Sequence, residues 1–101
     1  MWVYSMMIII TYDVAVTSPQ GVKRLRKISK QCVNYGQRVQ NSVFECVIDY
    51  STFLLLRKKL LDIMDKEQDS IRFYLLGNKS EGKIEHYGIK QGYNPEGFIV
   101  I

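Results

Sequence analysis

The sequence holds few of the residues that build metal clusters or disulfide frameworks. Two cysteines, Cys32 and Cys46, and one histidine, His86, occur in 101 residues. The cysteines lack the spacing of a zinc knuckle or a redox pair, and the chain shows no secretory signal. We therefore expect both to be small core side chains in a reducing cytoplasm. His86 lies in a polar segment, where we expect a surface role and not general-base catalysis.

Long apolar runs are also missing. The apolar start from Met1 to Ile10 is too short to span a bilayer, lacks a basic region ahead of it and is soon followed by Asp13. We expect a buried strand here and no membrane anchor. Because Met6 and Met7 are each a candidate initiator, residues 1–5 are a candidate leader outside the fold. No internal repeat or low-complexity stretch competes with a single domain over residues 1–101.

Basic residues outnumber acidic ones, 14 against 10, which gives a net charge of +4 and a pI near 9.1. This balance favours a polyanionic partner without specifying one. The length suits one domain with a real core, in a size range where dimerisation helps to bury apolar surface.

The first half of the chain predicts a strand, a helix and a hairpin. The strand covers Met6 to Tyr12, and Ser18 and Pro19 match a helix N-cap and first helical residue. This helix is expected to end at Tyr35, with Gly36 as a left-handed stop. Its predicted core stripe comprises Val22, Leu25, Ile28, Cys32 and Val33. The segment from Arg38 to Ile48 is β-rich and breaks at Asn41 and Ser42.

The second half predicts a further helix and strand. Ser51 or Thr52 is the expected helix cap, and Arg57 is expected in solvent. The predicted buried stripe comprises Phe53, Leu56, Leu60, Ile63 and Met64. A strand follows over residues 71–76.

A polar surface segment comes next, with a short strand near residues 83–87. The apolar ending Phe98 to Ile101 would be a sticky edge in solvent, so we expect it to add to a sheet edge, that of a second subunit included. The order βαββαβ implies an α+β fold, a four-stranded antiparallel sheet with both helices on one face. The other face then needs a cover, which a face-to-face homodimer would supply.

Asp13 is the main candidate for chemistry. A carboxylate directly behind a buried strand stands at a sheet edge, where a metal or phosphate can approach. A two-fold dimer presents it twice, and two carboxylates with waters and a substrate phosphate form a reasonable shell for Mg²⁺. An aspartate at a strand end is also a common turn former.

A cationic surface is predicted on the first helix. It comprises Lys23, Arg24, Arg26, Lys27 and Lys30, with Arg38 just beyond the turn. An ordinary solvated helix face is the alternative interpretation.

Several segments in this order resemble the CRISPR-associated Cas2 family over nearly the full length. They are Tyr12-Asp13-Val14, the helix ending Asn34-Tyr35-Gly36, the run from Gln37 to Cys46, and Asp69-Ser70-Ile71-Arg72-Phe73-Tyr74. The ending His86-Tyr87-Gly88 through Tyr93-Asn94-Pro95-Glu96-Gly97 resembles the subgroup that accompanies type I-C systems.

The resemblance implies a ferredoxin-like homodimer in which a C-terminal strand, here within residues 78–101, is exchanged between subunits. It implies a metal-dependent nuclease acting on RNA or duplex DNA, and an adaptor for the integrase that inserts new spacers. Asp13 would be the catalytic and metal residue, with Mg²⁺ or Mn²⁺. Arg38 would bind nucleic acid, and Arg24, Arg26 and Lys27 correspond approximately to the family's basic helix residues. Residues 15–20 lack the further acids common in the family, which predicts weak metal affinity.

Four functions remain open at this point. They are an Asp13-dependent endonuclease, a purely non-catalytic DNA-binding scaffold, a toxin-like ribonuclease of the same fold, and a single-stranded RNA binder of the RRM type. The last requires an aromatic signature on the central strand, which Val43 to Ile48 lacks. We favour the adaptor as the biological task and nuclease activity as an intrinsic property.

Overall fold

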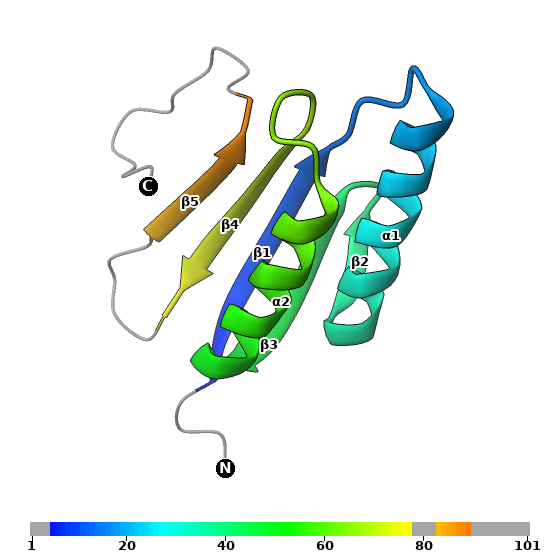
Figure 1. Cartoon of the computed structure of the whole chain (residues 1–101). Helices are drawn as coiled ribbons and strands as arrows, with labels where there is room; N and C mark the ends of the chain where they lie inside the picture. Colours follow the sequence, from blue (N-terminus) through cyan, green and yellow to red (C-terminus); the bar gives the residue numbers. More distant parts are fainter. Residues whose placement is uncertain (1–4, 78–82, 90–101) are drawn as a thin grey trace.

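The computed structural model describes residues 5–77 and 83–89. In these residues the elements follow in the order β1 (Ser5–Asp13), α1 (Pro19–Tyr35), β2 (Gln37–Gln40), β3 (Val43–Asp49), α2 (Tyr50–Ile63), β4 (Ser70–Leu76) and β5 (Lys83–Gly88). All the strands pair antiparallel in one sheet of order β2-β3-β1-β4-β5 (Figure 1). The predicted α+β, ferredoxin-like order is confirmed. The short strand expected in the polar segment is a full member of this sheet, at the edge beside β4.

Both helices cover one face of the sheet (Figure 1), because alternate residues of the central strands are apolar and point toward them. We call the opposite side, on which Asp13 and Val47 lie, the open face. The predicted core positions Cys32 and Cys46 are buried, and so are Tyr12 and Phe44. The fully buried side chains are Ile8, Ile10, Ile28, Cys32, Phe44, Phe53, Leu56, Leu60, Asp69, Ile71 and Phe73.

The ends of α1 follow one prediction and correct another. Ser18 caps the helix, since its Oγ accepts a hydrogen bond from the Gly21 amide at 3.1 Å. Gly36 does end the helix but has extended backbone, with φ −157°, and not the predicted left-handed conformation. A Cβ at this position would lie 2.3 Å from the Glu45 carbonyl oxygen, so glycine is needed here because β3 passes so close.

Three other positions differ from the predictions. The cap of α2 is Asp49 and not Ser51 or Thr52, because the Asp49 carboxylate accepts from the Thr52 amide at 2.8 Å. Val33 is 54% exposed and lies outside the core, since α1 turns that side to solvent. Arg57 is not simply solvated, because its Nη1 lies 2.8 Å from Oε1 of the buried Glu85.

Parts of three expectations lie outside the described residues. They are the leader residues 1–4, residues 78–82 and 90–97 of the C-terminal extension, and the apolar ending Phe98 to Ile101 with its exchanged strand. Ser5, which the leader prediction includes, is the first residue of β1 and pairs with Asp49. None of the described helices is long and apolar enough to cross a membrane. The cytoplasmic location stays a prediction.

Candidate metal and nucleic-acid site

Asp13 is the last residue of β1, and its side chain is exposed on the open face. It pairs with Ser70, the first residue of β4. Around it the surface forms a shallow depression of about 360 Å³, which we call the Asp13 depression. Its lining residues are Thr11, Tyr12, Asp13, Ser42, Val43, Ser70, Arg72, Tyr74 and His86. The depression therefore gathers residues from four strands and one turn around a single carboxylate.

Arg72 and His86 are the members of this depression that sequence reasoning missed. Strand pairing aligns Thr11 with Arg72 and Arg72 with His86, which places them on the same face. Arg72 Nε donates to His86 Nδ1 at 3.0 Å, and His86 Nε2 lies 2.8 Å from the Ile89 carbonyl oxygen. Because a guanidinium only donates, Nδ1 accepts and Nε2 carries the hydrogen. Both ring nitrogens are therefore engaged, which supports the expectation that His86 is not a general base.

The carboxylates alone do not make a closed metal site within one copy of the described chain. No group of three or more His, Cys, Asp or Glu side chains clusters there in residues 5–77 and 83–89. Ser70 and Ser42 line the same depression as Asp13. Mg²⁺ prefers oxygen ligands, keeps several waters and is commonly held by one or two carboxylates plus a substrate phosphate. Two copies of Asp13 that face each other would fit this ion.

The predicted basic residues lie in three different environments. Arg24 packs inward: its Nε lies 2.8 Å from Asp69 Oδ2, and its side chain is only 15% exposed. Lys27 is exposed and lies with Lys23 beside a shallow groove between α1 and the end of α2. Arg26 is also exposed, on the side of α1 that approaches β2. Arg24 lines the same groove as Lys23 and Lys27, but it differs from them because its guanidinium is paired with the buried Asp69.

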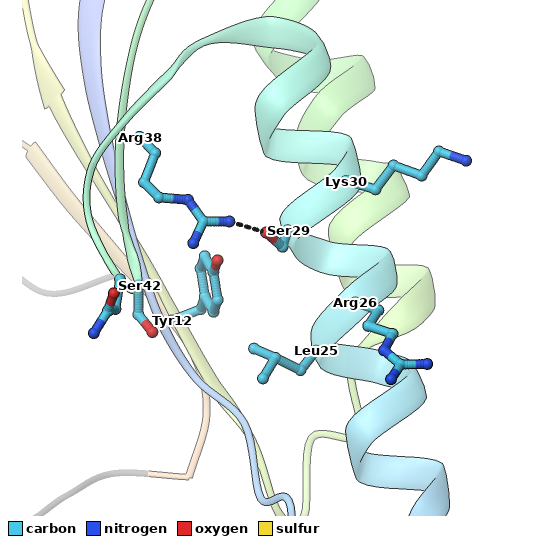
Figure 2. Close-up of a pocket in the computed structure, with 8 residues that line it drawn as sticks. Tyr12, Leu25, Arg26, Ser29, Lys30, Arg38 and Ser42 are labelled. Atoms are coloured by element: carbon cyan, nitrogen blue, oxygen red, sulfur yellow. Dashed lines mark hydrogen bonds between the residues drawn. The ribbon is translucent and has the colours of Figure 1, made fainter.

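Arg38 lies in a groove between α1 and β2, which we call the α1–β2 groove (Figure 2). Its Nη2 donates to Ser29 Oγ at 2.6 Å, and its guanidinium carbon lies 5.2 Å from the centre of the Phe44 ring. The groove has a volume of about 410 Å³. It is lined by Tyr12, Leu25, Arg26, Ser29, Lys30, Arg38, Asn41 and Ser42. Arg38 is therefore an exposed cation whose direction is fixed from two sides.

The polar groups inside the groove converge, while two cations lie at its outer rim. Figure 2 shows the Tyr12 hydroxyl near Ser29 and the Arg38 guanidinium, with the Arg26 and Lys30 side chains extending away from the sheet. Burial raises the pKa of the Tyr12 phenol, although Ser29 and Arg38 partly oppose this. Tyr12 is therefore a neutral hydroxyl at physiological pH.

The Asp13 depression and the α1–β2 groove are neighbours. Tyr12 and Ser42 line both, and the Tyr12 amide donates to the Ser42 carbonyl oxygen at 3.1 Å. This bond fixes the turn between β2 and β3 against β1. Tyr12 and Phe44 also stack within the core, with ring centres 6.0 Å apart, so they support this rim as expected.

Comparison with known proteins gives one consistent result. The family model described as CRISPR associated protein Cas2 matches residues 6–84. CRISPR-associated endoribonuclease Cas2 of Nitratidesulfovibrio vulgaris is 50% identical over 97 residues, which cover 96% of this chain and 95% of that protein. CRISPR-associated endonuclease Cas2 of Halalkalibacterium halodurans is 50% identical over 91 residues, which cover 90% and 95%.

A solved structure agrees with these relatives. The crystal structure of Streptococcus pyogenes Cas2 at pH 6.5 matches with a TM-score of 0.67 and 54% identity, over 73% of this chain and 89% of that one. The topology, the family model and the relatives all support the same assignment. The chain belongs to the CRISPR-associated Cas2 family.

Proposed function

We propose that this protein is a CRISPR adaptation protein: a homodimer that binds nucleic acid, serves as the adaptor for the integrase in spacer acquisition and has intrinsic Mg²⁺-dependent endonuclease activity. The Asp13 depression is the observation that carries the proposal. It places one exposed carboxylate on a sheet face that the helices leave open, next to a groove with an oriented arginine.

The open face supports the dimer. Val47 is 63% exposed and Leu76 is 43% exposed, and both point away from the helices. Apolar side chains on the free side of a sheet favour packing against a second copy, and a two-fold axis makes such an interface from one patch. Packing of two open faces would bring the two Asp13 side chains toward a shared site.

This geometry fits a hydrolytic role for Asp13. The residues that would hold Mg²⁺, or Mn²⁺, are Asp13 of each subunit, with the nearby serine hydroxyls and waters completing the shell. When bound, the ion would supply Lewis acidity at a phosphodiester. Side chains of the protein itself would hold the nucleic-acid strand around the bound ion. The relatives are named endoribonuclease and endonuclease, which supports nuclease activity and leaves both RNA and DNA as substrates.

The cations support binding through the phosphate backbone. A strand that lies in the Asp13 depression reaches Arg38 by crossing the rim at Ser42. Arg38 would bind one phosphate there, and Arg26 at the outer rim would neutralise the next. Lys27, farther along α1, would contact a longer nucleic acid such as duplex DNA. Such contacts position the backbone without reading bases.

The test compares Asp13→Asn with Asp62→Asn, which removes an exposed acid of α2 that pairs with Lys58 at 3.1 Å. Cleavage of labelled RNA and duplex DNA is measured with Mg²⁺ and with Mn²⁺, and spacer acquisition is measured in cells. We expect Asp13→Asn to lose cleavage and keep acquisition, while Asp62→Asn keeps both. If Asp13→Asn cleaves like the parent protein, the metal site is wrong. If deletion of the gene leaves acquisition unchanged, the adaptor role is wrong.

A purely non-catalytic DNA-binding scaffold is the second candidate. Two observations favour it: each described copy offers one carboxylate in the depression, and both His86 nitrogens are already engaged. It predicts acquisition without any metal-dependent cleavage by the parent protein. The toxin-like ribonuclease predicts a neighbouring antitoxin gene in place of an integrase gene. The type I-C assignment stays a prediction, which the genomic neighbourhood tests.

A further inference from the structure

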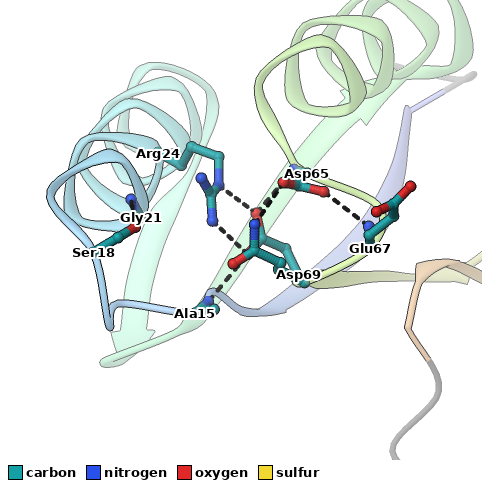
Figure 3. Close-up of polar contacts among 8 residues, drawn as sticks. Ala15, Ser18, Gly21, Arg24, Asp65, Glu67 and Asp69 are labelled. Atoms are coloured by element: carbon teal, nitrogen blue, oxygen red, sulfur yellow. Dashed lines mark hydrogen bonds and ion pairs between the residues drawn. The ribbon is translucent and has the colours of Figure 1, made fainter.

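Asp69 is a fully buried carboxylate that the proposed chemistry does not use. It lies just before β4 and accepts hydrogen bonds from three directions (Figure 3). Its Oδ1 accepts from the Ala15 amide at 3.0 Å, and its Oδ2 accepts from the Asp65 amide at 2.9 Å. Arg24 adds contacts from Nε at 2.8 Å and from Nη2 at 3.3 Å. One side chain therefore joins the end of β1, α1 and the turn after α2.

These contacts hold the backbone on both sides of Asp13. Ala15, two residues after Asp13, is bound by the Asp69 side chain. Ser70, the residue after Asp69, is the strand partner of Asp13. Through its own carbonyl oxygen Asp69 also accepts from the Ile89 amide at 3.0 Å, which holds the end of β5 beside the same depression. Movement of Asp69 would therefore shift the segment that aims the Asp13 side chain.

Arg24 is the cationic partner of the buried Asp69 carboxylate. Burial alone would raise the pKa of the Asp69 carboxyl, but the hydrogen bonds from Arg24, Asp65 and Ala15 outweigh it and hold the pKa below its ordinary value. Removal of one partner of a buried ion pair leaves the other charge uncompensated. Loss of Arg24 would therefore loosen the carboxylate from the Ala15 amide.

We propose that Arg24 and Asp69 are a positioning pair that sets the direction of Asp13, and that Arg24 acts inside the fold and not as a nucleic-acid contact. This inference rests on the proposed function of Asp13. It accounts for an arginine whose side chain is 15% exposed in the middle of an otherwise solvated row of cations. The neighbouring Lys27, which is exposed, keeps its predicted role at the surface.

The chain supplies a matched control. Arg57 and Glu85 form another pair with a buried acid and the same 2.8 Å distance, with side chains 26% and 3% exposed. This pair joins α2 to β5 and has no hydrogen bond to the segment after Asp13. Arg57→Met and Arg24→Met therefore each remove a guanidinium from an ion pair with a buried acid, but only Arg24 pairs with the acid that binds the Ala15 amide.

The first measurement is hydrogen exchange of the Ala15 amide by NMR in the full chain. We expect Arg24→Met and Asp69→Asn to speed this exchange at least tenfold relative to the parent protein, while Arg57→Met leaves it within twofold. This readout needs no metal and no nuclease activity. Unchanged Ala15 exchange in a folded Arg24→Met protein would overturn the proposal, whether or not the nuclease exists.

The second measurement is Mn²⁺ affinity by electron paramagnetic resonance, with cleavage kinetics and nucleic-acid binding alongside. We expect Arg24→Met to lower Mn²⁺ affinity and kcat about tenfold, the size typical for groups that orient a metal ligand, with strand affinity within twofold. Arg24→Lys should restore part of the lost Mn²⁺ affinity and kcat, because lysine keeps the positive charge but not the planar, forked guanidinium. If Arg24→Met weakens strand binding as Lys27→Met does and leaves Mn²⁺ affinity intact, Arg24 is a direct contact. If the parent protein binds no Mn²⁺, the proposed metal site at Asp13 fails, and Ala15 exchange still decides whether Arg24 and Asp69 hold this segment.

Discussion

Replacement of Arg38 by glutamine tests the nucleic-acid path through the α1–β2 groove. Arg38 is held by Ser29 at 2.6 Å and by the Phe44 ring at 5.2 Å, so its guanidinium is oriented before a strand arrives. A charge-assisted hydrogen bond contributes about 1.5–3 kcal/mol, and about 1.4 kcal/mol corresponds to a tenfold change in affinity. We therefore expect Arg38→Gln to weaken binding of a single-stranded oligonucleotide at least about tenfold at low salt.

The salt dependence separates a phosphate contact from a structural effect. Loss of one phosphate contact lowers the slope of log affinity against log salt by about 0.7 for a single strand. Between 50 and 200 mM salt the affinity deficit of Arg38→Gln should therefore shrink about 2.6-fold. Arg38→Lys should keep the parental slope, because it keeps the charge, and should still bind more weakly because it loses the planar fork.

The assay is fluorescence anisotropy with a labelled oligonucleotide at several salt concentrations. Lys23→Gln is the control, since it removes one charge from α1 at a position that lies outside the groove. Loss of the ring contact should lower the free energy of unfolding by about 0.5–1 kcal/mol, so the variant should still fold. An unchanged salt slope in Arg38→Gln, or an equal loss in Lys23→Gln, would refute the reasoning.

Three further predictions concern the fold that carries the site. Hydrogen bonds from Thr52 lower the pKa of Asp49, so the ionised cap stabilises the fold above about pH 4, and this stabilisation fades as pH falls through the folded pKa. Because asparagine is also a good cap, Asp49→Asn should keep the parental free energy of unfolding at pH 7 and lose less of it than the parent protein at low pH, as measured by urea titrations. Burial raises the pKa of Cys32 to about 12 and of Cys46 to about 11, so at pH 8 each native thiol should react at least about 100-fold more slowly than a free cysteine with a thiol reagent; rapid labelling without denaturant would contradict this packing. Gly88 has φ 95°, and a Cβ there would lie 2.0 Å from the Asp69 carbonyl oxygen, so Gly88→Ala should lower the free energy of unfolding by about 2–4 kcal/mol; a loss below about 0.5 kcal/mol in chemical denaturation would be inconsistent with this close approach.

The sequence predicts best what local pattern controls. The apolar run that predicts β1 and the Ser18-Pro19 start of α1 depend on residues close in the chain, and the structure confirms both. The predicted cap of α2 lies two or three residues after the observed one, because an aspartate such as Asp49 suits both the end of a strand and the start of a helix. A glycine after a helix can serve as a left-handed stop or can leave room for a neighbouring backbone. Only the position of the Glu45 carbonyl shows that Gly36 does the second.

The site was predictable only in part, because its pieces come from distant segments. Asp13 stands out by its place behind an apolar strand. That Arg72 and His86 lie beside Asp13 depends on the register of three strands. The ion-pair partner of Arg24, Asp69, lies 45 residues away along the chain. The row of basic residues along α1 does not show which cation turns inward, since that depends on where a buried acid of another segment meets the helix.

Mn²⁺ stoichiometry tests most directly the central claim that two copies of Asp13 share one ion. Titration of the full chain, followed by electron paramagnetic resonance and with its mass measured in solution, should give one Mn²⁺ per two chains at saturation in the parent protein and none in Asp13→Asn. A monomer, or a dimer that binds Mn²⁺ equally well with and without the Asp13 carboxylate, would contradict it.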